Sequence, residues 1–162
     1  MKAPTTYEEA LKVLEKMDKT EAENNDISIE TILTLYGIED EGAARLRAEQ
    51  DAKLAAVNDI EGLWELSFQF SDSSRMQEKV LAKIEDVCRA RFENAHDTDT
   101  LWDILVNTPC DSKISTDILM KIVSLSRCTI ELWKVAYQSP DDSEARAAAL
   151  KKIVELTPEP TP

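Results

Sequence analysis

The segment LWDILVNTPCDSKISTDILMKIVSL, residues 101–125, decides the fold because its pattern occurs three times in the chain. The Leu-Trp pair that opens it recurs at Leu63-Trp64 and Leu132-Trp133. In each copy a Ser stands ten residues after the Trp, and apolar residues stand sixteen and 23 residues after the Trp. A Leu-x-Lys-Ile block also ends 20 residues after the Trp in each copy. The blocks are Leu81–Ile84, Leu119–Ile122 and Leu150–Ile153. Such agreement indicates an internal repeat.

Each copy is predicted to be a helical hairpin. Its first helix is short and ends about seven residues past the Trp, where Ser71, Pro109 and Pro140 stand and where a Pro stops a helix. The Ser three residues later is expected to cap the second helix, at Ser74, Ser112 and Ser143. A single hairpin cannot bury its apolar face, but stacked hairpins can. The pattern therefore predicts an all-α fold, a short right-handed α-solenoid with an N-terminal helical segment.

The three Trp residues are predicted to be structural. Each stands beside a Leu where the next hairpin must pack, and Trp102 is expected to matter most because its hairpin has neighbours on both sides. Large-to-small changes at such core sites cost about 3–5 kcal/mol.

Upstream of the repeats, capping signals predict three further helices. Thr6 with Glu9 starts one, Ser28 with Thr31 starts the next, and Gly37 is expected to end that second helix. The predicted segments are an N-terminal helix and polar linker over 1–27, a capping hairpin over 28–58, three hairpin repeats over 59–157 and an extended Pro-rich tail over 158–162. The predicted helices lie near 6–18, 28–36, 39–57, 59–70, 74–93, 98–107, 112–126, 129–138 and 143–156.

The repeat resembles the tetratricopeptide family of helical-hairpin repeats over about residues 58–157. That family's motif begins with Trp and places a small residue in its second helix, which Ala149 matches sixteen residues after Trp133. Other positions depart from the family, because its Gly four and Tyr seven residues after the Trp are replaced by Val106 and Pro109 in the middle copy. The resemblance implies a protein-binding platform without chemistry of its own.

The charge and composition of the chain disfavour some classes of ligand and cellular compartment. The 162 residues carry a net charge of −13, with −8 in residues 1–62 and −5 in residues 63–162. Such a surface repels phosphate backbones and attracts basic partners. No apolar run approaches the length of a membrane span, and the first residues have no apolar signal region. Three scattered cysteines, Cys88, Cys110 and Cys128, favour reduced thiols in the cytoplasm, each expected to be buried in an apolar helix face.

Few residues of the sequence are candidates for a catalytic, metal-binding or cofactor-binding site. The single histidine, His96, has no nucleophile elbow near it, and Asp97 or Thr98 is expected to cap the following helix. No Gly-rich phosphate loop or metal-ligand spacing occurs, so no cofactor, metal or catalytic residue is predicted. Residues 29–50 have the outline of a helix-turn-helix, but acids on the second helix would face phosphate, which favours a hairpin that closes the array.

One polar pattern in the repeats is a candidate binding surface. A charged residue follows each Trp by one position and an amide follows it by five, which places the two on one helix face. The predicted partner-binding residues are Glu65, Gln69, Asp103, Asn107, Lys134 and Gln138. Amides both donate and accept hydrogen bonds, which suits a peptide backbone. The alternative is that an amide simply suits the end of a helix before a turn.

The sequence therefore predicts a non-enzymatic scaffold that binds another protein or a peptide, with a basic partner favoured by the charge. Nucleic acid, membrane and cofactor are not expected as ligands, and the protein is expected to be a monomer or weak dimer. The main alternative is an acidic inhibitor or nucleic-acid mimic that occupies a basic groove on a partner. An enzyme ranks third.

Overall fold

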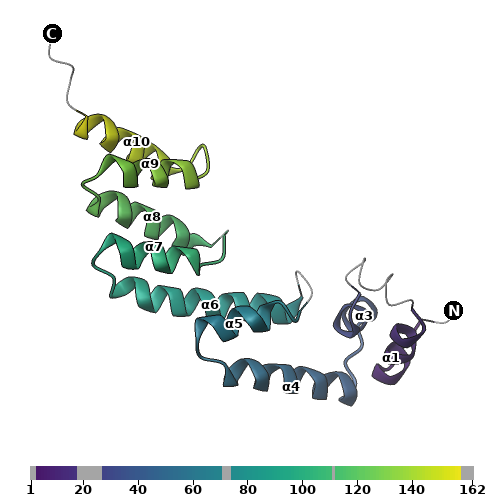
Figure 1. The fold of residues 1–162 in the computed structure, drawn as a ribbon. Coiled ribbons are helices and arrows are strands. Elements are labelled where there is room, and N and C mark those ends of the chain that lie inside the picture. Colours follow the sequence, from purple (N-terminus) through teal and green to yellow (C-terminus); the bar gives the residue numbers. More distant parts are fainter. Residues whose placement is uncertain (1–2, 18–26, 71–73, 111, 158–162) are drawn as a thin grey trace, which may run out of the picture. The chain divides into compact units, whose positions relative to one another are not determined.

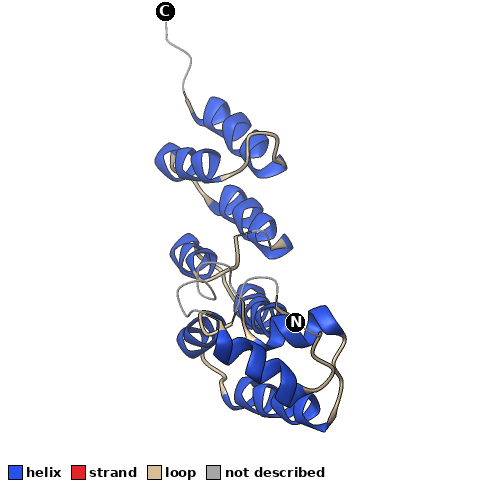
Figure 2. Ribbon diagram, turned by 90° about the vertical axis from the view of Figure 1, so that its right-hand side faces the viewer, coloured by secondary structure: helices blue, strands red, loops and turns tan. Residues whose placement is uncertain are grey.

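The computed structural model describes residues 3–17, 27–70, 74–110 and 112–157, and these residues form nine α-helices and no strand (Figure 1). The helices are α1 (Tyr7–Lys16), α3 (Ile29–Tyr36), α4 (Glu41–Ala56), α5 (Ile60–Ser67), α6 (Arg75–Glu93), α7 (Thr98–Val106), α8 (Lys113–Leu125), α9 (Thr129–Gln138) and α10 (Glu144–Leu156). The described residues are helical with no strand in Figure 2, so the all-α prediction is confirmed. A helix is present at each predicted place. The predicted polar linker, the helix stop at Ser71 and the Pro-rich tail lie outside the described residues.

Capping side chains start most of these helices where the sequence predicts. The Ser28 hydroxyl accepts the Thr31 N–H, and the Asp97 carboxylate accepts the Thr100 N–H at 2.8 Å. Gly37 ends α3 in the left-handed conformation at φ 62°, which a glycine adopts without strain. The prediction for Ser112 is wrong in one respect: it occupies the N-cap of α8, but its side chain makes no cap bond and lies 3.1 Å from the Ser115 hydroxyl.

The chain divides into two compact units, residues 1–83 and 84–162, with the division inside α6. In the first unit α1 packs against α3 and α4. The buried core there is Ala10, Ile32, Leu33, Ile38 and Ala43. Asp40 ties this unit together, because its carboxylate accepts the Ala43 N–H at the start of α4 and the Tyr7 N–H at the start of α1.

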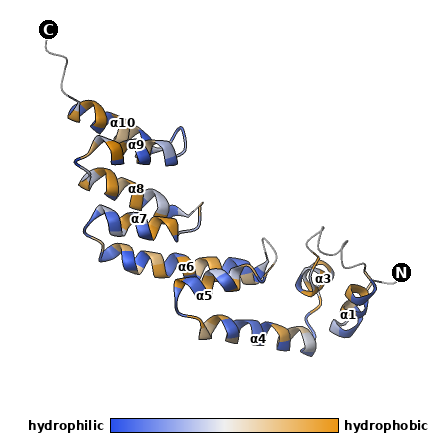
Figure 3. Cartoon of the chain, in the orientation of Figure 1, coloured by the Kyte–Doolittle hydropathy of each residue, from blue (hydrophilic) through white to orange (hydrophobic). Residues whose placement is uncertain are grey.

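In the second unit α7 packs on α8, α8 on α9 and α9 on α10, and α10 also packs on α8. The helices are amphipathic, as the alternation of hydrophobic and hydrophilic residues in Figure 3 shows. Their inward sides supply a continuous apolar core. The fully buried large side chains of this unit are Ile84, Leu101, Ile104, Ile114, Ile118, Ile122, Leu132 and Val135.

The prediction that the Trp residues anchor the core is wrong for Trp133, which is 56% exposed, and Trp64 and Trp102 are only half-buried. The Leu that precedes each Trp is the buried member of the pair, and Leu63, Leu101 and Leu132 are all 0% exposed. Adjacent helix residues point about 100° apart, so one of the two faces the core and the other lies at its edge.

The expectation for the cysteines is also wrong in part. Cys88 is buried, whereas Cys110 and Cys128 are exposed, and all three are free thiols. Cys110 falls between α7 and α8, and Cys128 falls at the N-cap of α9, so neither lies on the inward face of a helix.

The Lys of each Leu-x-Lys-Ile block has a role that the spacing alone did not reveal. Lys83 Nζ donates to the Leu54 carbonyl, Lys121 Nζ to the Phe92 carbonyl, and Lys152 Nζ to the Val123 carbonyl. Each acceptor lies 29 residues earlier, at the C-terminal end of α4, α6 or α8. A cation there satisfies end carbonyls and complements the helix dipole. We call these three side chains the junction lysines.

Candidate functional site

An exposed apolar stripe runs along α9. Ile130 is 67% exposed, Trp133 56% and Tyr137 90%. These positions are separated by three and four residues, so the three side chains share one side of the helix. Lys134 and Gln138 flank the stripe, and all five residues line one shallow hollow of about 480 Å³. Core packing does not use these side chains, because α9 buries Leu132, Val135 and Ala136 on its other side.

The equivalent positions on α7 carry a different chemistry. Asp99 and Asp103 are exposed, Val106 is 82% exposed, and Trp102 is half-buried. Asp99 takes the place that Ile130 has on α9, and Asp103 takes the place of Lys134. The α7 side of the surface is therefore acidic, whereas the α9 side is aromatic and aliphatic.

Glu131 holds α7 and α9 together at their N-terminal ends. Its carboxylate accepts a bond from the Thr98 hydroxyl at 3.0 Å and another from the Ser126 hydroxyl at 2.8 Å. Thr98 is the first residue of α7, and Ser126 is the C-cap of α8. The bonds fix the start of α9 against both neighbours, so the exposed sides of α7 and α9 form one surface.

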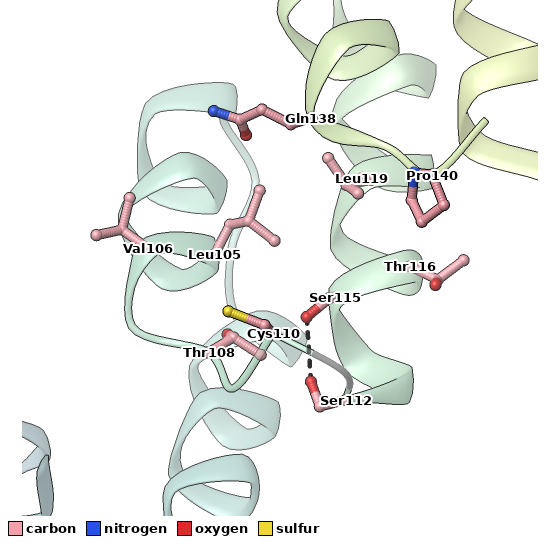
Figure 4. Close-up of a pocket in the computed structure, with 10 residues that line it drawn as sticks. All are labelled: Leu105, Val106, Thr108, Cys110, Ser112, Ser115, Thr116, Leu119, Gln138 and Pro140. Atoms are coloured by element: carbon pink, nitrogen blue, oxygen red, sulfur yellow. Dashed lines mark hydrogen bonds between the residues drawn. The ribbon is translucent and has the colours of Figure 1, made fainter. Parts of the chain in front are cut away.

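A groove of about 640 Å³ lies between the C-terminal ends of α7 and α9, above the start of α8 (Figure 4). Leu105 and Leu119 stand on opposite sides of it, Gln138 lies at its upper rim in this view, and Ser112 and Ser115 lie at the lower end. Among the residues that the structure describes, none of those lining the groove is charged. The lining residues are Leu105, Val106, Thr108, Cys110, Ser112, Ser115, Thr116, Leu119, Gln138 and Pro140.

We call the α7–α9 surface and this groove together the first-helix face. Its members outside the groove are Asp99, Trp102, Asp103, Ile130, Trp133, Lys134 and Tyr137.

The predicted binding residues fall into two groups. Asp103, Asn107, Lys134 and Gln138 belong to the second unit, where Lys134 and Gln138 lie on the exposed stripe of α9. Glu65 and Gln69 belong to the first unit and are exposed at the end of α5. The sequence reasoning missed the apolar part of this surface, although Phe68, Val106 and Tyr137 share one repeat position and are each more than 80% exposed.

Asn107 has a bond that the capping alternative predicts. Its amide Nδ2 donates to the Asp103 carbonyl at 2.8 Å, one turn back along α7. Asn107 is also the C-cap of that helix. This geometry favours a helix-ending role for Asn107. Asp103 remains available at the surface, where its carboxylate accepts a single bond of 3.0 Å from Arg91 and is 69% exposed.

In this unit, local contacts shift the pKa of an aspartate and of a cysteine. Two hydrogen bonds from Thr100 lower the pKa of Asp97, which is the cap of α7. Burial raises the pKa of the Cys88 thiol, which makes it less nucleophilic. His96 is exposed next to the cap.

Within the described ranges, no group of three or more His, Cys, Asp or Glu side chains is arranged to hold a metal ion. Of the helices in those ranges, none has the length and apolar character needed to cross a membrane.

Comparison with known proteins finds no family model, no curated protein and no solved structure that matches this chain.

Proposed function

We propose that this protein is a non-catalytic scaffold that binds another protein or a peptide through the first-helix face. The observation that carries the proposal is the stripe of Ile130, Trp133 and Tyr137, which stays exposed on a helix whose opposite side is fully packed. Contiguous apolar patches bordered by polar residues commonly mark interaction sites. Exposed Trp and Tyr are also among the residues that contribute most to binding energy at interfaces.

The proposed architecture is a short α-solenoid similar in kind to tetratricopeptide repeats. It is supported by the junction lysines, whose bonds join consecutive hairpins at a constant separation of 29 residues. Packing of α8 on both α7 and α9, and of α10 on both α8 and α9, also suits stacked hairpins. In this architecture the first helices of neighbouring hairpins line one surface, which is the surface proposed for binding.

The proposal also covers cofactors, the cellular compartment and the binding residues of the first unit. The scaffold needs no cofactor and has no catalytic residue. Its three free thiols favour a reducing compartment such as the cytoplasm. Glu65 on α5 and Gln69 just after that helix occupy the repeat positions of Lys134 and Gln138, and both are proposed as binding residues of the first unit.

A comparison of captured proteins tests the proposal. Immobilised wild type, Tyr137→Ser and Val154→Ser would be exposed to the same cell extract. Val154 is the matched control because it is 74% exposed but lies on α10, outside the first-helix face. We expect a protein that is retained by wild type and by Val154→Ser but lost with Tyr137→Ser. Equal retention by all three would contradict the proposed surface.

The second candidate function is an acidic inhibitor or nucleic-acid mimic, which the net charge of −13 favours. Raising the salt concentration during capture separates the two functions. A mimic held by charge should be released as salt rises, irrespective of Tyr137, whereas binding through an apolar surface should change modestly.

A further inference from the structure

We infer that the partner of the first-helix face is a positively charged segment, with arginines at one end and large apolar side chains at the other. The inference rests on the proposed function and adds the chemistry of the ligand.

The first step concerns charge on α7. Asp99 and Asp103 stand one turn apart on the exposed side of this helix, and the Asp103 carboxylate forms a solvent-exposed ion pair with Arg91. Exposed ion pairs contribute little to stability, so an incoming cation can replace Arg91 at small cost. The whole chain adds to the attraction through its net charge of −13.

The second step concerns the neighbouring aromatic surface. Trp133 and Tyr137 are exposed on α9, whose first turn is joined to the start of α7 by the bond between Glu131 and Thr98. Arginine is the cation that suits the α7 carboxylates, because its planar guanidinium pairs with a carboxylate through two hydrogen bonds, whereas large apolar side chains suit the exposed Trp133 and Tyr137. Lysine does not offer this fork geometry.

The third step concerns orientation. Lys134 is the cation within the α9 stripe, and it repels a basic side chain placed at that end of the surface. The groove next to it, about 640 Å³ with Leu105 and Leu119 on its walls, has no charged residue in its described lining and accepts a large apolar side chain. The basic end of the segment therefore lies over α7, and the apolar end lies over α9 and the groove.

A second copy of this chain fits the same surface less well. If two α9 helices packed antiparallel about a two-fold axis, the Lys134 side chains near the middle of each helix would face each other. Like charges in apposition disfavour such an interface.

The test uses three labelled synthetic peptides of equal length. The first has Arg residues in one half and Leu residues in the other, the second replaces Arg with Glu, and the third replaces Leu with Ser. Fluorescence anisotropy would measure their dissociation constants on the full chain. We expect the Arg–Leu peptide to bind most tightly, and both changes to weaken binding.

Protein variants then locate the contacts. Asp99→Asn combined with Asp103→Asn should raise the dissociation constant of the Arg–Leu peptide about threefold to tenfold, as loss of two surface ion pairs predicts. The matched control is Asp86→Asn combined with Glu155→Gln, which removes the same charge from exposed sites on α6 and α10 and should leave binding nearly unchanged. Lys134→Glu should tighten binding, and Lys151→Glu should not. Melting curves would confirm that each variant is folded.

The outcomes separate this inference from the proposed function. Stronger binding of the Glu–Leu peptide, or equal effects of the two double variants, would overturn the basic partner. Failure of the Arg–Leu peptide to bind up to its solubility limit would overturn it as well. In these cases the proposed function stands if capture still depends on Tyr137. A wild-type dimer that Tyr137→Ser converts to monomer would show that a second copy covers the face.

Discussion

Replacing Lys152 by Met tests whether the junction lysines hold consecutive hairpins together. Lys152 Nζ donates to the Val123 carbonyl at 2.6 Å and to the Ser124 carbonyl at 2.9 Å, both at the end of α8. Methionine keeps most of the aliphatic stem but removes the charge and the donors. The neighbouring Lys151 is exposed on the same helix, so Lys151→Met is a matched control.

The expected loss follows from the geometry. A hydrogen bond to a charged group contributes about 1.5–3 kcal/mol, and a cation at a helix C-terminus about 0.3–1 kcal/mol. Water can reach the Ser124 end of this site, since Ser124 is exposed, and the released side chain regains rotamer freedom. The net loss should therefore be about 1–2 kcal/mol. For a chain of this length that corresponds to a fall in melting temperature of about 2–8 °C.

Thermal melts followed by circular dichroism would measure this difference. The control Lys151→Met should lie within about 0.5 kcal/mol of wild type, as expected for a surface change. If Lys152→Met melts together with Lys151→Met, the bonds to α8 do not stabilise the junction. The junction lysines would then no longer count as evidence for stacked hairpins.

Three further predictions follow from the fold. Leu101→Ala should destabilise the protein by about 2–5 kcal/mol, far more than Trp133→Ala, because Leu101 is fully buried and Trp133 is exposed; chemical denaturation that ranks them in the opposite order would refute this assignment. The hydrogen bonds from backbone N–H groups lower the pKa of Asp40. The stabilisation that the Asp40 carboxylate provides is therefore present above about pH 4 and is lost as the pH falls through its folded-state pKa. Asp40→Asn, which can still cap α4, should show a smaller fall in melting temperature below about pH 4 than wild type. The protein should not shift labelled DNA or RNA in a gel at about 50 mM salt, where electrostatic binding is strongest, and a clear shift at micromolar protein would contradict the reading of the charge.

The secondary structure could be predicted closely because its determinants are local. Ser28, Gly37 and Asp97 mark helix ends through bonds to groups within a few residues, and such bonds form wherever the chain takes a helical path. The repeat spacing also located the buried Ile84, Ile122 and Ile153, since an apolar position that recurs with helical period must face a neighbour.

The binding surface could be predicted only in part. The polar positions on the first helices were visible as a repeat, and Lys134 and Gln138 do lie on the exposed stripe. The aromatic component was missed because a Trp in a repeat pattern is usually a core residue. Its exposure depends on how α9 rotates against its neighbours, and that rotation is set by contacts such as those of Glu131 with Thr98 and Ser126.

The sequence by itself determined the all-helical fold, the approximate bounds of the helices, the recurring Leu-Trp pattern and the acidic charge. The tertiary structure decided which member of each Leu-Trp pair is buried, where the groove lies and what the junction lysines bind. The physical reason is the range of the interactions. Capping and helical period act within one or two turns, whereas Lys152 reaches a carbonyl 29 residues away, and only the packed helices bring those two groups together.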